Sequence, residues 1–146
     1  MIALIQRVSG ASVEVEGRVT GAIGRGILAL IGVETADSPS SAGLLLEKVL
    51  SYRIFPDDAG KMNLNVRQIG GGLLLVPQFT LVADTRKGTR PGFSGGAPPD
   101  QARELFEALL RGAEAAHSPV ASGVFGADMQ VHLVNDGPVT FLLHSP

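Results

Sequence analysis

The sequence predicts a single α+β domain whose strand-rich core is covered by about two helices. Two observations lead to this fold class. Segments with the short, apolar or alternating pattern of strands outnumber helical segments, and the chain has 146 residues, the size of one ordinary domain. A composition that is 45% hydrophobic and 18% charged is typical of a packed core. No repeat or long linker divides residues 1–146.

Seven segments are predicted to be strands because they are rich in apolar or β-branched side chains and end at turn residues. In chain order they are residues 3–15, 19–23, 27–33, 73–76, 120–125, 129–134 and 139–144. Gly17 provides a turn between the first two, which then form a hairpin. The third is an apolar run typical of a buried strand, and three glycines at residues 70–72 precede the fourth.

Two segments have the start signals and the periodicity of helices. Ser38 and Pro39 are typical of an N-cap followed by proline at the first helical position. Over residues 40–52, apolar side chains recur near one side of a helix, namely Leu44, Leu45, Val49 and Tyr52. The second helix is expected to begin at Pro98 and Pro99, and its apolar stripe comprises Ala102, Leu105, Phe106, Leu109 and Leu110.

Residues 84–99 are predicted to be the one long loop, because they are rich in Gly, Pro, Ser and basic residues and have no periodicity. Long ordered loops commonly carry function. The net charge of −2 argues mildly against a nucleic-acid partner, since phosphates attract Lys and Arg. Six basic residues in the middle of the chain offer either a local basic face or an ordinary solvated surface: Arg53, Lys61, Arg67, Arg86, Lys87 and Arg90.

The residue types in the sequence exclude several classes of site. The absence of cysteine excludes a disulfide framework, a thiolate nucleophile and a cysteine-ligated zinc. The histidines, His117, His132 and His144, lack the spacing of metal ligands, so we expect no metal and no cofactor. Arg7 interrupts the N-terminal apolar stretch, and no apolar run approaches the roughly 20 residues of a membrane span. A cytoplasmic protein without membrane attachment is therefore expected.

Residues 77–81, PQFTL, contain the first polar groups that could form a site. They follow a predicted strand, and in extended structure Gln78 and Thr80 would share one face. The two side chains offer an amide and a hydroxyl but no base, and threonine without a base is a weak nucleophile. Alone, such a segment is more commonly a strand end.

Residues 135–140, NDGPVT, lie between two predicted strands. Asn-Asp-Gly favours a hairpin turn. Pro138 complicates that interpretation, because it enters a strand without an N–H to donate and can form a cis peptide bond with Gly137. A cis bond would redirect both carbonyls and could aim them into a pocket.

Together, these two segments resemble the signature pair of the D-aminoacyl-tRNA deacylases (D-tyrosyl-tRNA(Tyr) deacylases), Ser-Gln-Phe-Thr-Leu and Asn-x-Gly-Pro-Val-Thr. The resemblance extends over essentially the whole chain, in the family's order and spacing. It includes IALIQRVSGASVEVEG, RIFPDDAGKMNLN, ADTRKGTRPGFSGGAPP and FGADMQVHLVNDGPVT. One position departs from the pattern: Pro77 stands where the family has serine, so the chemistry should not depend on a hydroxyl there.

The resemblance implies a homodimer with two active sites at the interface and, in each subunit, a mainly antiparallel or mixed, barrel-like sheet. Gly137 and Pro138 of one subunit, joined by a cis bond, would enter the partner's pocket. Their carbonyls would hold the α-amino group of the substrate and leave no room for an L side chain. The other implied site residues are Gln78, Phe79 and Thr80 at the scissile ester and terminal adenosine, and Phe125 and Met129 in the adenosine pocket.

The implied activity is hydrolysis of the ester bond of D-aminoacyl-tRNA, with tRNA and no DNA as partner. Since neither segment contains a convincing base, we expect the ribose 2′-hydroxyl of the tRNA to assist the attack of water. Backbone N–H groups around Phe79 and Thr80 would stabilise the oxyanion. Glycine has no side chain to exclude, so glycyl-tRNA mischarged on tRNA(Ala) is an expected second substrate.

Two alternatives remain open at the level of sequence. In the first, Thr80 is a covalent nucleophile, which requires a base near it. In the second, the chain is a non-catalytic module that binds RNA ends, although an aromatic content of only 5% is unfavourable for a stacking platform.

Overall fold

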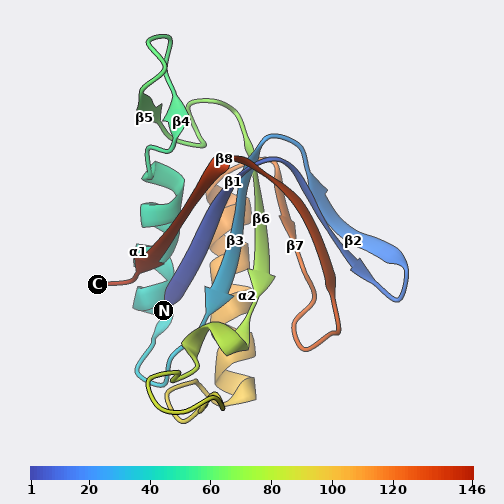
Figure 1. Ribbon diagram of the computed structural model, residues 1–146, viewed down its shortest axis with the longest axis vertical. Coiled ribbons are helices and arrows are strands. Elements are labelled where there is room, and N and C mark those ends of the chain that lie inside the picture. The colour runs from blue at the N-terminus through green and yellow to red at the C-terminus, as the bar shows by residue number, and fades with distance from the viewer.

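The computed structural model describes residues 1–146 and contains eight strands, two α-helices and one short 3₁₀ helix, η1 (Figure 1). In chain order the elements are β1 Ile2–Val15, β2 Arg18–Ile23, β3 Gly26–Gly32, α1 Pro39–Ser51, β4 Phe55–Pro56, β5 Met62–Leu64, β6 Gly72–Pro77, η1 Phe79–Val82, α2 Pro99–Ala116, β7 Val120–Ser122 and β8 Gln130–His144. None of the helices is both long and apolar enough to span a bilayer.

A six-stranded mixed sheet forms the frame, in the order β2-β1-β3-β6-β7, with β8 also paired to β1. β1 is long enough to pair antiparallel with β3 through its first half, with β2 through its second half, and with β8 along its whole length. β6 pairs in parallel with both β3 and β7. Gly21 of β2 lies so close to β7 that an added Cβ would be 2.6 Å from the carbonyl oxygen of Ser122. The two ends of the sheet therefore meet, and the predicted α+β class is confirmed as a nearly closed mixed sheet with two helices.

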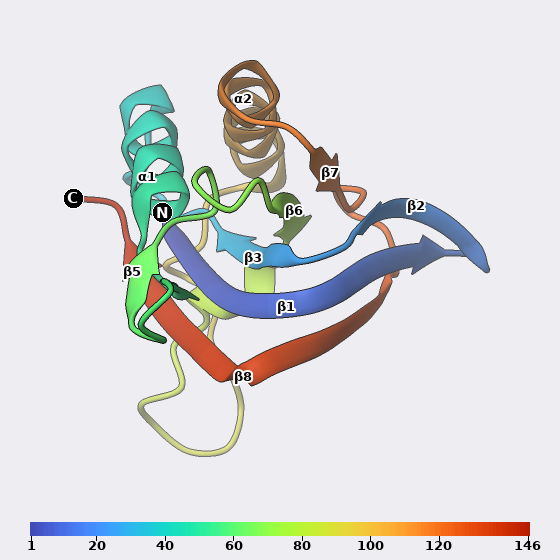
Figure 2. The same ribbon diagram turned by 90° about the horizontal axis from the view of Figure 1, so that it is seen from above.

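Both helices cover the same face of the sheet, and β8 lies farthest from them, beyond β1 (Figure 2). The main core of 23 buried residues lies between the helices and the sheet and includes Leu45 of α1 and Phe106 of α2. A second cluster of seven, which includes Val8 and Val76, packs among β1, β2, β3 and β6. The central strands β3 and β6 are thus covered on both faces, which explains their nearly continuous apolar sequences.

The predicted helices form, but the apolar face predicted for α1 is partly wrong. Leu44 is 49% exposed. With 3.6 residues per turn, the buried face is centred between Leu45, Leu46 and Val49, and Leu44 falls to its side. In α2 the predicted face is buried except at Leu110, which is only half-buried; Ala113 extends this face by another turn.

The structure also corrects the predicted strands. β7 is only three residues long, and the segments predicted as 129–134 and 139–144 form one continuous strand, β8. The hairpin-turn interpretation of residues 135–140 is therefore wrong: the 14-residue β1 offers one partner edge to both halves of β8, and the chain bulges instead of reversing. β4, β5 and η1 were not predicted, because elements of two to four residues are too short to show a period.

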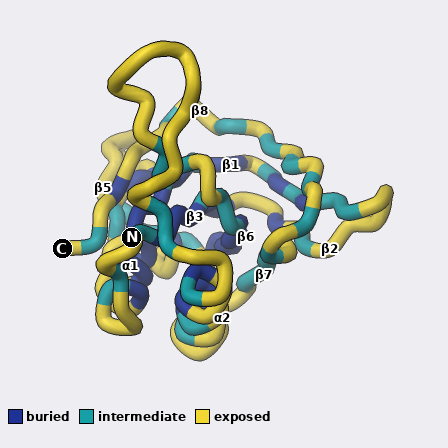
Figure 3. Tube along the Cα trace, turned by 90° about the horizontal axis from the view of Figure 1, so that it is seen from below, coloured by how far each residue is buried: buried dark blue, intermediate teal, exposed yellow.

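The predicted long loop at residues 84–99 has no regular secondary structure before α2 begins. It is largely exposed (Figure 3) and extends beyond β8 (Figure 2). Isolated antiparallel bridges hold it at two points, between Asp84 and Gly92 and between Glu34 and Gly96. The first bridge closes the loop on itself and the second ties its end to the segment after β3, so the loop is irregular but constrained.

Candidate functional site

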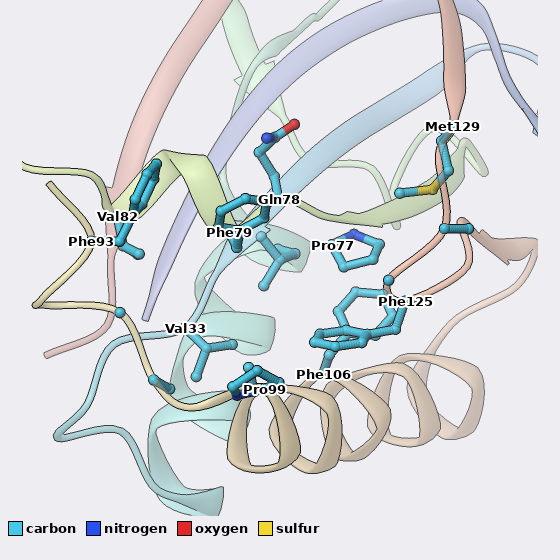
Figure 4. A pocket seen from close by; sticks show the side chains of 16 residues that line it. Val33, Pro77, Gln78, Phe79, Val82, Phe93, Pro99, Phe106, Phe125 and Met129 are labelled. Atoms are coloured by element: carbon cyan, nitrogen blue, oxygen red, sulfur yellow. The ribbon is translucent and has the colours of Figure 1, made fainter. Parts of the chain in front are cut away.

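A cavity of about 470 Å³ opens between the end of β6, η1, α2 and the loop after β7. Aromatic and apolar side chains dominate its walls, and Gln78 lies at its rim (Figure 4). Sixteen residues line it: Ile31, Val33, Pro77, Gln78, Phe79, Val82, Phe93, Gly96, Ala97, Pro99, Ala102, Phe106, Phe125, Gly126, Ala127 and Met129. A cavity of this size with aromatic walls suits a small ligand group with a flat ring that can pack against them, such as a nucleoside base.

The parallel strands β3 and β6 form the floor of the cavity. Both strands end at the same edge of the sheet, and ligand sites of sheets with parallel strands commonly lie at that edge. The N–H of Gln78 still donates to the carbonyl of Ile31 at 2.8 Å, so the ladder runs one residue past β6. η1 then turns the chain away and leaves Gln78 and Phe79 at the cavity mouth.

The loop after β7 forms the opposite wall. The N–H of Gly123 donates to the carbonyl of Leu75 at 2.8 Å, and the chain then turns, so Phe125 lies in a turn and not in a strand. The N–H of Val124 donates to the Met129 sulfur at 3.3 Å. Phe125 packs against Phe106 with ring centroids 6.4 Å apart. These contacts hold Phe125 and Met129 together in the cavity wall, and their assignment to an adenosine pocket stays a prediction.

Arg103 packs against the outer side of this wall. Its guanidinium carbon lies 4.8 Å from the centroid of the Phe125 ring, a cation–π contact that the sequence did not suggest. Arg103 is exposed on α2, so this contact places one cation on the Phe125 side of the cavity.

Gln78 and Thr80 lie together, but not in the predicted extended conformation. Gln78 precedes η1 and Thr80 lies within it, and the Gln78 side-chain amide donates to the Thr80 hydroxyl oxygen. Phe79 projects outward and is 68% exposed. The prediction that alternation along a strand brings Gln78 and Thr80 to one face is thus wrong, and a tight helical turn brings them together instead. Thr80 itself does not line the cavity.

None of the sixteen lining residues has an ionisable side chain. The carboxyl groups with perturbed pKa values lie elsewhere: hydrogen bonds from Arg67, Asn63 and Arg86 lower the pKa values of Glu47, Asp57 and Asp84, respectively. The Thr80 hydroxyl has an amide as its side-chain partner. No group of three or more His, Asp or Glu side chains is placed to hold a metal ion. The chemistry available at the cavity is therefore positioning and hydrogen bonding by neutral groups.

The second candidate segment forms a bulge in β8, and none of its residues lines the cavity. On β1, Gln6 pairs with Thr140 and Val8 with Asn135, so the residues between them leave the ladder. The Asn135 side chain closes the bulge: its Oδ1 accepts from the N–H of Val139 at 2.7 Å, and its Nδ2 donates to the Thr140 hydroxyl at 2.8 Å.

Gly137 and Pro138 are exposed at the turn of this bulge, and the peptide bond between them is cis. Gly137 has φ +144°, and an added Cβ would lie 2.7 Å from Val139 Cγ2 and 3.2 Å from a guanidinium nitrogen of Arg7. A side chain at position 137 would therefore force the bulge to change shape.

Arg7 is the functional candidate that the sequence analysis missed. Its Nε donates to the carbonyl of Asp136 and one Nη to the carbonyl of Ile54, both at 2.8 Å. The side chain is only 14% exposed. A charged residue directly after the apolar start of the first strand was the available signal, because such a charge needs polar partners nearby. Arg7 thus fastens the Gly137–Pro138 bulge to the body of the domain.

Pro77 is compatible with its position at the end of β6. On the side of β6 that faces β7, the last hydrogen bond runs from the N–H of Gly123 to the carbonyl of Leu75. β7 itself has already ended at Ser122. Two residues further along, Pro77 faces that same side, where no strand remains to receive an N–H. The proline ring lies beside Gly123 in the cavity wall, so the departure from the family pattern leaves no broken ladder bond.

The fold and the site define a small α+β domain with an apolar, nucleoside-sized cavity and a separate, rigidly held Gly-Pro bulge. Comparisons with known proteins agree with this class. A family model described as D-Tyr-tRNA(Tyr) deacylase matches residues 4–144. A D-aminoacyl-tRNA deacylase of Pseudomonas putida is 62% identical over 143 residues, which cover 98% of this chain and 99% of that protein. One of Methylococcus capsulatus is 58% identical over 146 residues, covering 100% and 95%. The chain belongs to the D-Tyr-tRNA(Tyr) deacylase family.

Two solved structures have the same architecture. One, titled c-Myc DNA Unwinding Element Binding Protein, is 40% identical, has a TM-score of 0.95, and matches over 100% of this chain and 99% of that one. The other, titled as a probable eukaryotic D-amino acid tRNA deacylase, has a TM-score of 0.80 over 97% of both chains at 16% identity. At that identity the second likeness concerns the fold alone.

Proposed function

We propose that this protein hydrolyses the ester bond between a D-amino acid and the 3′ end of tRNA, releasing the amino acid and free tRNA. The observation that carries the proposal is the family match over residues 4–144, with curated relatives of about 60% identity. The cavity supports it, because its size and apolar walls suit the terminal adenosine and its lining includes Pro77, Gln78 and Phe79 of the first signature segment.

In this proposal the adenine base lies between Phe125 and Met129, and the ester lies at the rim near Gln78. The first two N–H groups of η1, at Phe79 and Thr80, precede its first internal bond, from the N–H of Leu81 to the carbonyl of Gln78 at 3.2 Å. Helix-initial N–H groups lack internal partners, so they can donate to the oxyanion that forms during attack. The Gln78–Thr80 hydrogen bond fixes the shape of this turn.

The absence of ionisable groups from the cavity wall favours assistance by the substrate itself. The 2′-hydroxyl of the terminal ribose is adjacent to the ester and can orient or activate the attacking water, while the protein positions the reactants. A substrate with a 2′-deoxyadenosine end should bind nearly as well but hydrolyse far more slowly, because only the transition state uses that hydroxyl. Equal single-turnover rates for the two substrates would remove this part of the proposal.

The chiral filter is proposed to be the Gly137–Pro138 bulge of a second subunit. The bulge is exposed, held by Arg7 and Asn135, and absent from the cavity of its own chain. β8 pairs only with β1 and leaves Val134 and Leu142 more than half exposed, which supports β8 as the dimer contact. In the partner's cavity, the carbonyls would bind the α-amino group and exclude an L side chain. Glycyl-tRNA mischarged on tRNA(Ala) would not be excluded, because glycine has no side chain, and it would be hydrolysed.

The decisive experiment compares hydrolysis of D-Tyr-tRNA, L-Tyr-tRNA and Gly-tRNA(Ala), with light scattering on the same preparation. We expect a dimer that deacylates the first and third substrates and leaves the second intact. An active monomer would exclude the cross-subunit filter, and no deacylation of D-Tyr-tRNA would exclude the activity. That no DNA binds remains a prediction, and a deoxyribonucleotide competitor in the same assay tests it.

The two rival functions predict different results in that assay. A Thr80 nucleophile predicts an acyl-enzyme on Thr80 that mass spectrometry would detect. A non-catalytic RNA-end module predicts binding of uncharged tRNA without turnover of any substrate.

A further inference from the structure

We infer that the ring pair Phe79–Phe93 and the adjoining cations Lys87 and Arg90 form a second binding site for the unpaired nucleotides that precede the terminal adenosine. The identification of the ligand as a tRNA end rests on the proposed function. The site itself rests on the exposed aromatic pair and on the charge of the loop that contains Phe93.

The two rings form an exposed apolar surface at the mouth of the cavity. Their centroids are 5.3 Å apart with an interplanar angle of 47°. Phe79 is 68% exposed and Phe93 43%, although rings of this size are usually buried. Figure 4 shows both on the side of the cavity opposite Phe125. A nucleoside in the cavity therefore leaves a free aromatic face beside it.

The loop that contains Phe93 is held in place before any ligand arrives. Asp84 and Gly92 exchange two backbone hydrogen bonds, of 2.7 and 3.0 Å, directly before Phe93. Behind it, the N–H of Thr35 donates to the carbonyl of Gly95 at 3.2 Å, and the N–H of Ala97 donates to the carbonyl of Val33 at 3.0 Å. Phe93 is thus fixed between two anchored points, so stacking on it costs little ordering of the protein.

The tip of the loop carries positive charge on the same short segment as Phe93. Of its three basic residues, Arg86 is paired with Asp84 at 2.7 Å, whereas Lys87 and Arg90 are exposed and form no ion pair. Arg90 is three residues from Phe93, so their Cα atoms are at most about 11 Å apart. Two unpaired cations within six residues of an exposed ring match a ligand that alternates bases and phosphates.

This combination favours a nucleic acid over a protein partner. A protein surface that covers two rings needs an apolar complement, and two uncompensated cations at its edge would be unfavourable without acidic groups opposite them. Single-stranded nucleotides supply both requirements, since every base can stack on a ring and every phosphate attracts a cation. On the Phe125 side of the cavity, Arg103 is a lone cation whose adjacent ring faces the cavity.

The experiment compares binding of adenosine with binding of the trinucleotide CpCpA by calorimetry. The two ligands differ only in the two nucleotides that the second site would hold. The intact protein should bind CpCpA about tenfold more tightly than adenosine, which is the contribution of about one stacked base.

Four variants locate the source of that difference. Phe93→Leu should remove most of the difference in affinity between CpCpA and adenosine. Phe93→Tyr, which keeps the ring, should retain that difference. The double variant Lys87→Ala/Arg90→Ala should weaken CpCpA but not adenosine, and should flatten the dependence of log affinity on log salt by about 0.7 per cation removed. The control Arg18→Ala/Lys61→Ala removes the same charge from two exposed positions elsewhere, at the start of β2 and directly before β5, and should have no effect.

Three results would overturn the inference. The first is equal affinity of the intact protein for CpCpA and adenosine. The second is that Arg103→Ala, but none of the loop variants, abolishes the difference in affinity between CpCpA and adenosine. That result would place the RNA over α2. The third is an equal loss of both ligands in Phe93→Leu together with dissociation of the dimer, which would make the rings a subunit contact. Turnover of D-Tyr-tRNA is measured separately, so failure of the proposed activity would not be confused with failure of this site.

Discussion

The cavity and the β8 bulge contain the two signature segments of the chain, yet the fold keeps them apart. The cavity lies below the end of β6, near η1 at the bottom of Figure 1, whereas β8 bends at the top. Apolar contacts build the cavity, and it is complete within one chain. A hydrogen bond donated by Arg7 and one that the Asn135 side chain accepts from Val139 hold the bulge, which ends in solvent.

Under the proposed function, this difference means that neither region is a full site by itself. The cavity is proposed to bind the nucleoside, and its neutral, mostly apolar lining offers no charged group to hold an α-amino group. The bulge exposes Gly137 and Pro138, and none of its residues lines the cavity. Changes in the bulge should therefore affect chirality and rate, and changes in the cavity should affect nucleoside binding.

The largest effect is expected for Gly137→Ala. Its Cβ would meet Val139 and Arg7 at 2.7 and 3.2 Å, and φ +144° is unfavourable for alanine, so the bulge must change shape. We expect D-Tyr-tRNA deacylation to fall about a hundredfold, discrimination against L-Tyr-tRNA to weaken, and adenosine binding to stay unchanged. Single-turnover assays and calorimetry measure the three quantities.

The matched control is Gly43→Ala in α1, where an added Cβ has no neighbour within 4 Å. It should leave deacylation intact. Full D-activity with full rejection of L-Tyr-tRNA in Gly137→Ala would show that the bulge is only a bend, and the chiral filter would have to be sought elsewhere.

A smaller effect is expected for Arg7→Ala, which leaves the bulge residues in place but removes their tether. Two backbone carbonyls lose a charged donor, so the free energy of unfolding should fall by about 2 kcal/mol. Deacylation should fall about tenfold with unchanged adenosine affinity. Arg7→Lys should recover only part of the stability and part of the deacylation rate. An ammonium cannot reproduce the geometry in which one guanidinium donates to two separate carbonyls. A loss of adenosine binding instead would mean that Arg7 supports the cavity.

The bulge illustrates what the sequence can and cannot predict. Local chemistry identified residues 135–140 as special through Pro138, and the resemblance gave Gly137 and Pro138 their expected role. The sequence could not reveal that β1 would pair with both flanking halves of β8, because such pairing joins residues more than a hundred positions apart. Arg7 was missed for the same reason, since its partner Asp136 is 129 positions away.

The cavity was predicted through individual residues more than through structure. Gln78, Phe79, Phe125 and Met129 do line one space, but the 3₁₀ turn and the short β7 that bring them there were not predicted. Both depend on where neighbouring strands end, which is decided by the closure of the sheet and not by local sequence. Phe93 and Arg103 had no pattern of their own and emerged only from the packing.

A modest effect is expected for Thr80→Ala, which tests the chemistry of the cavity rim. The hydroxyl accepts one hydrogen bond from Gln78 and faces no base, so its loss should reduce the rate by about three- to tenfold without any adduct in the wild type. Thr80→Ser should restore the rate. Complete loss of deacylation in Thr80→Ala, with an acylated Thr80 trapped in the wild type, would establish a covalent mechanism. A base that activates Thr80 would then have to be identified.

The smallest effect is expected for Pro77→Ser, which restores the residue of the family pattern on the cavity side. The new N–H would face the gap beyond the end of β7, where it breaks no existing bond, and the new hydroxyl would join a wall without ionisable groups. Deacylation should therefore change by no more than about twofold, and rejection of L-Tyr-tRNA should not change at all, because the bulge is untouched.

The unfolded chain gains freedom when proline is lost, so the free energy of unfolding of Pro77→Ser should fall by about 0.4–1 kcal/mol. Chemical denaturation and single-turnover kinetics on the same preparation separate the two effects. A rate increase of several orders of magnitude would mean that the serine hydroxyl takes part in the reaction and that Pro77 has impaired this protein, which would contradict a mechanism based on positioning alone.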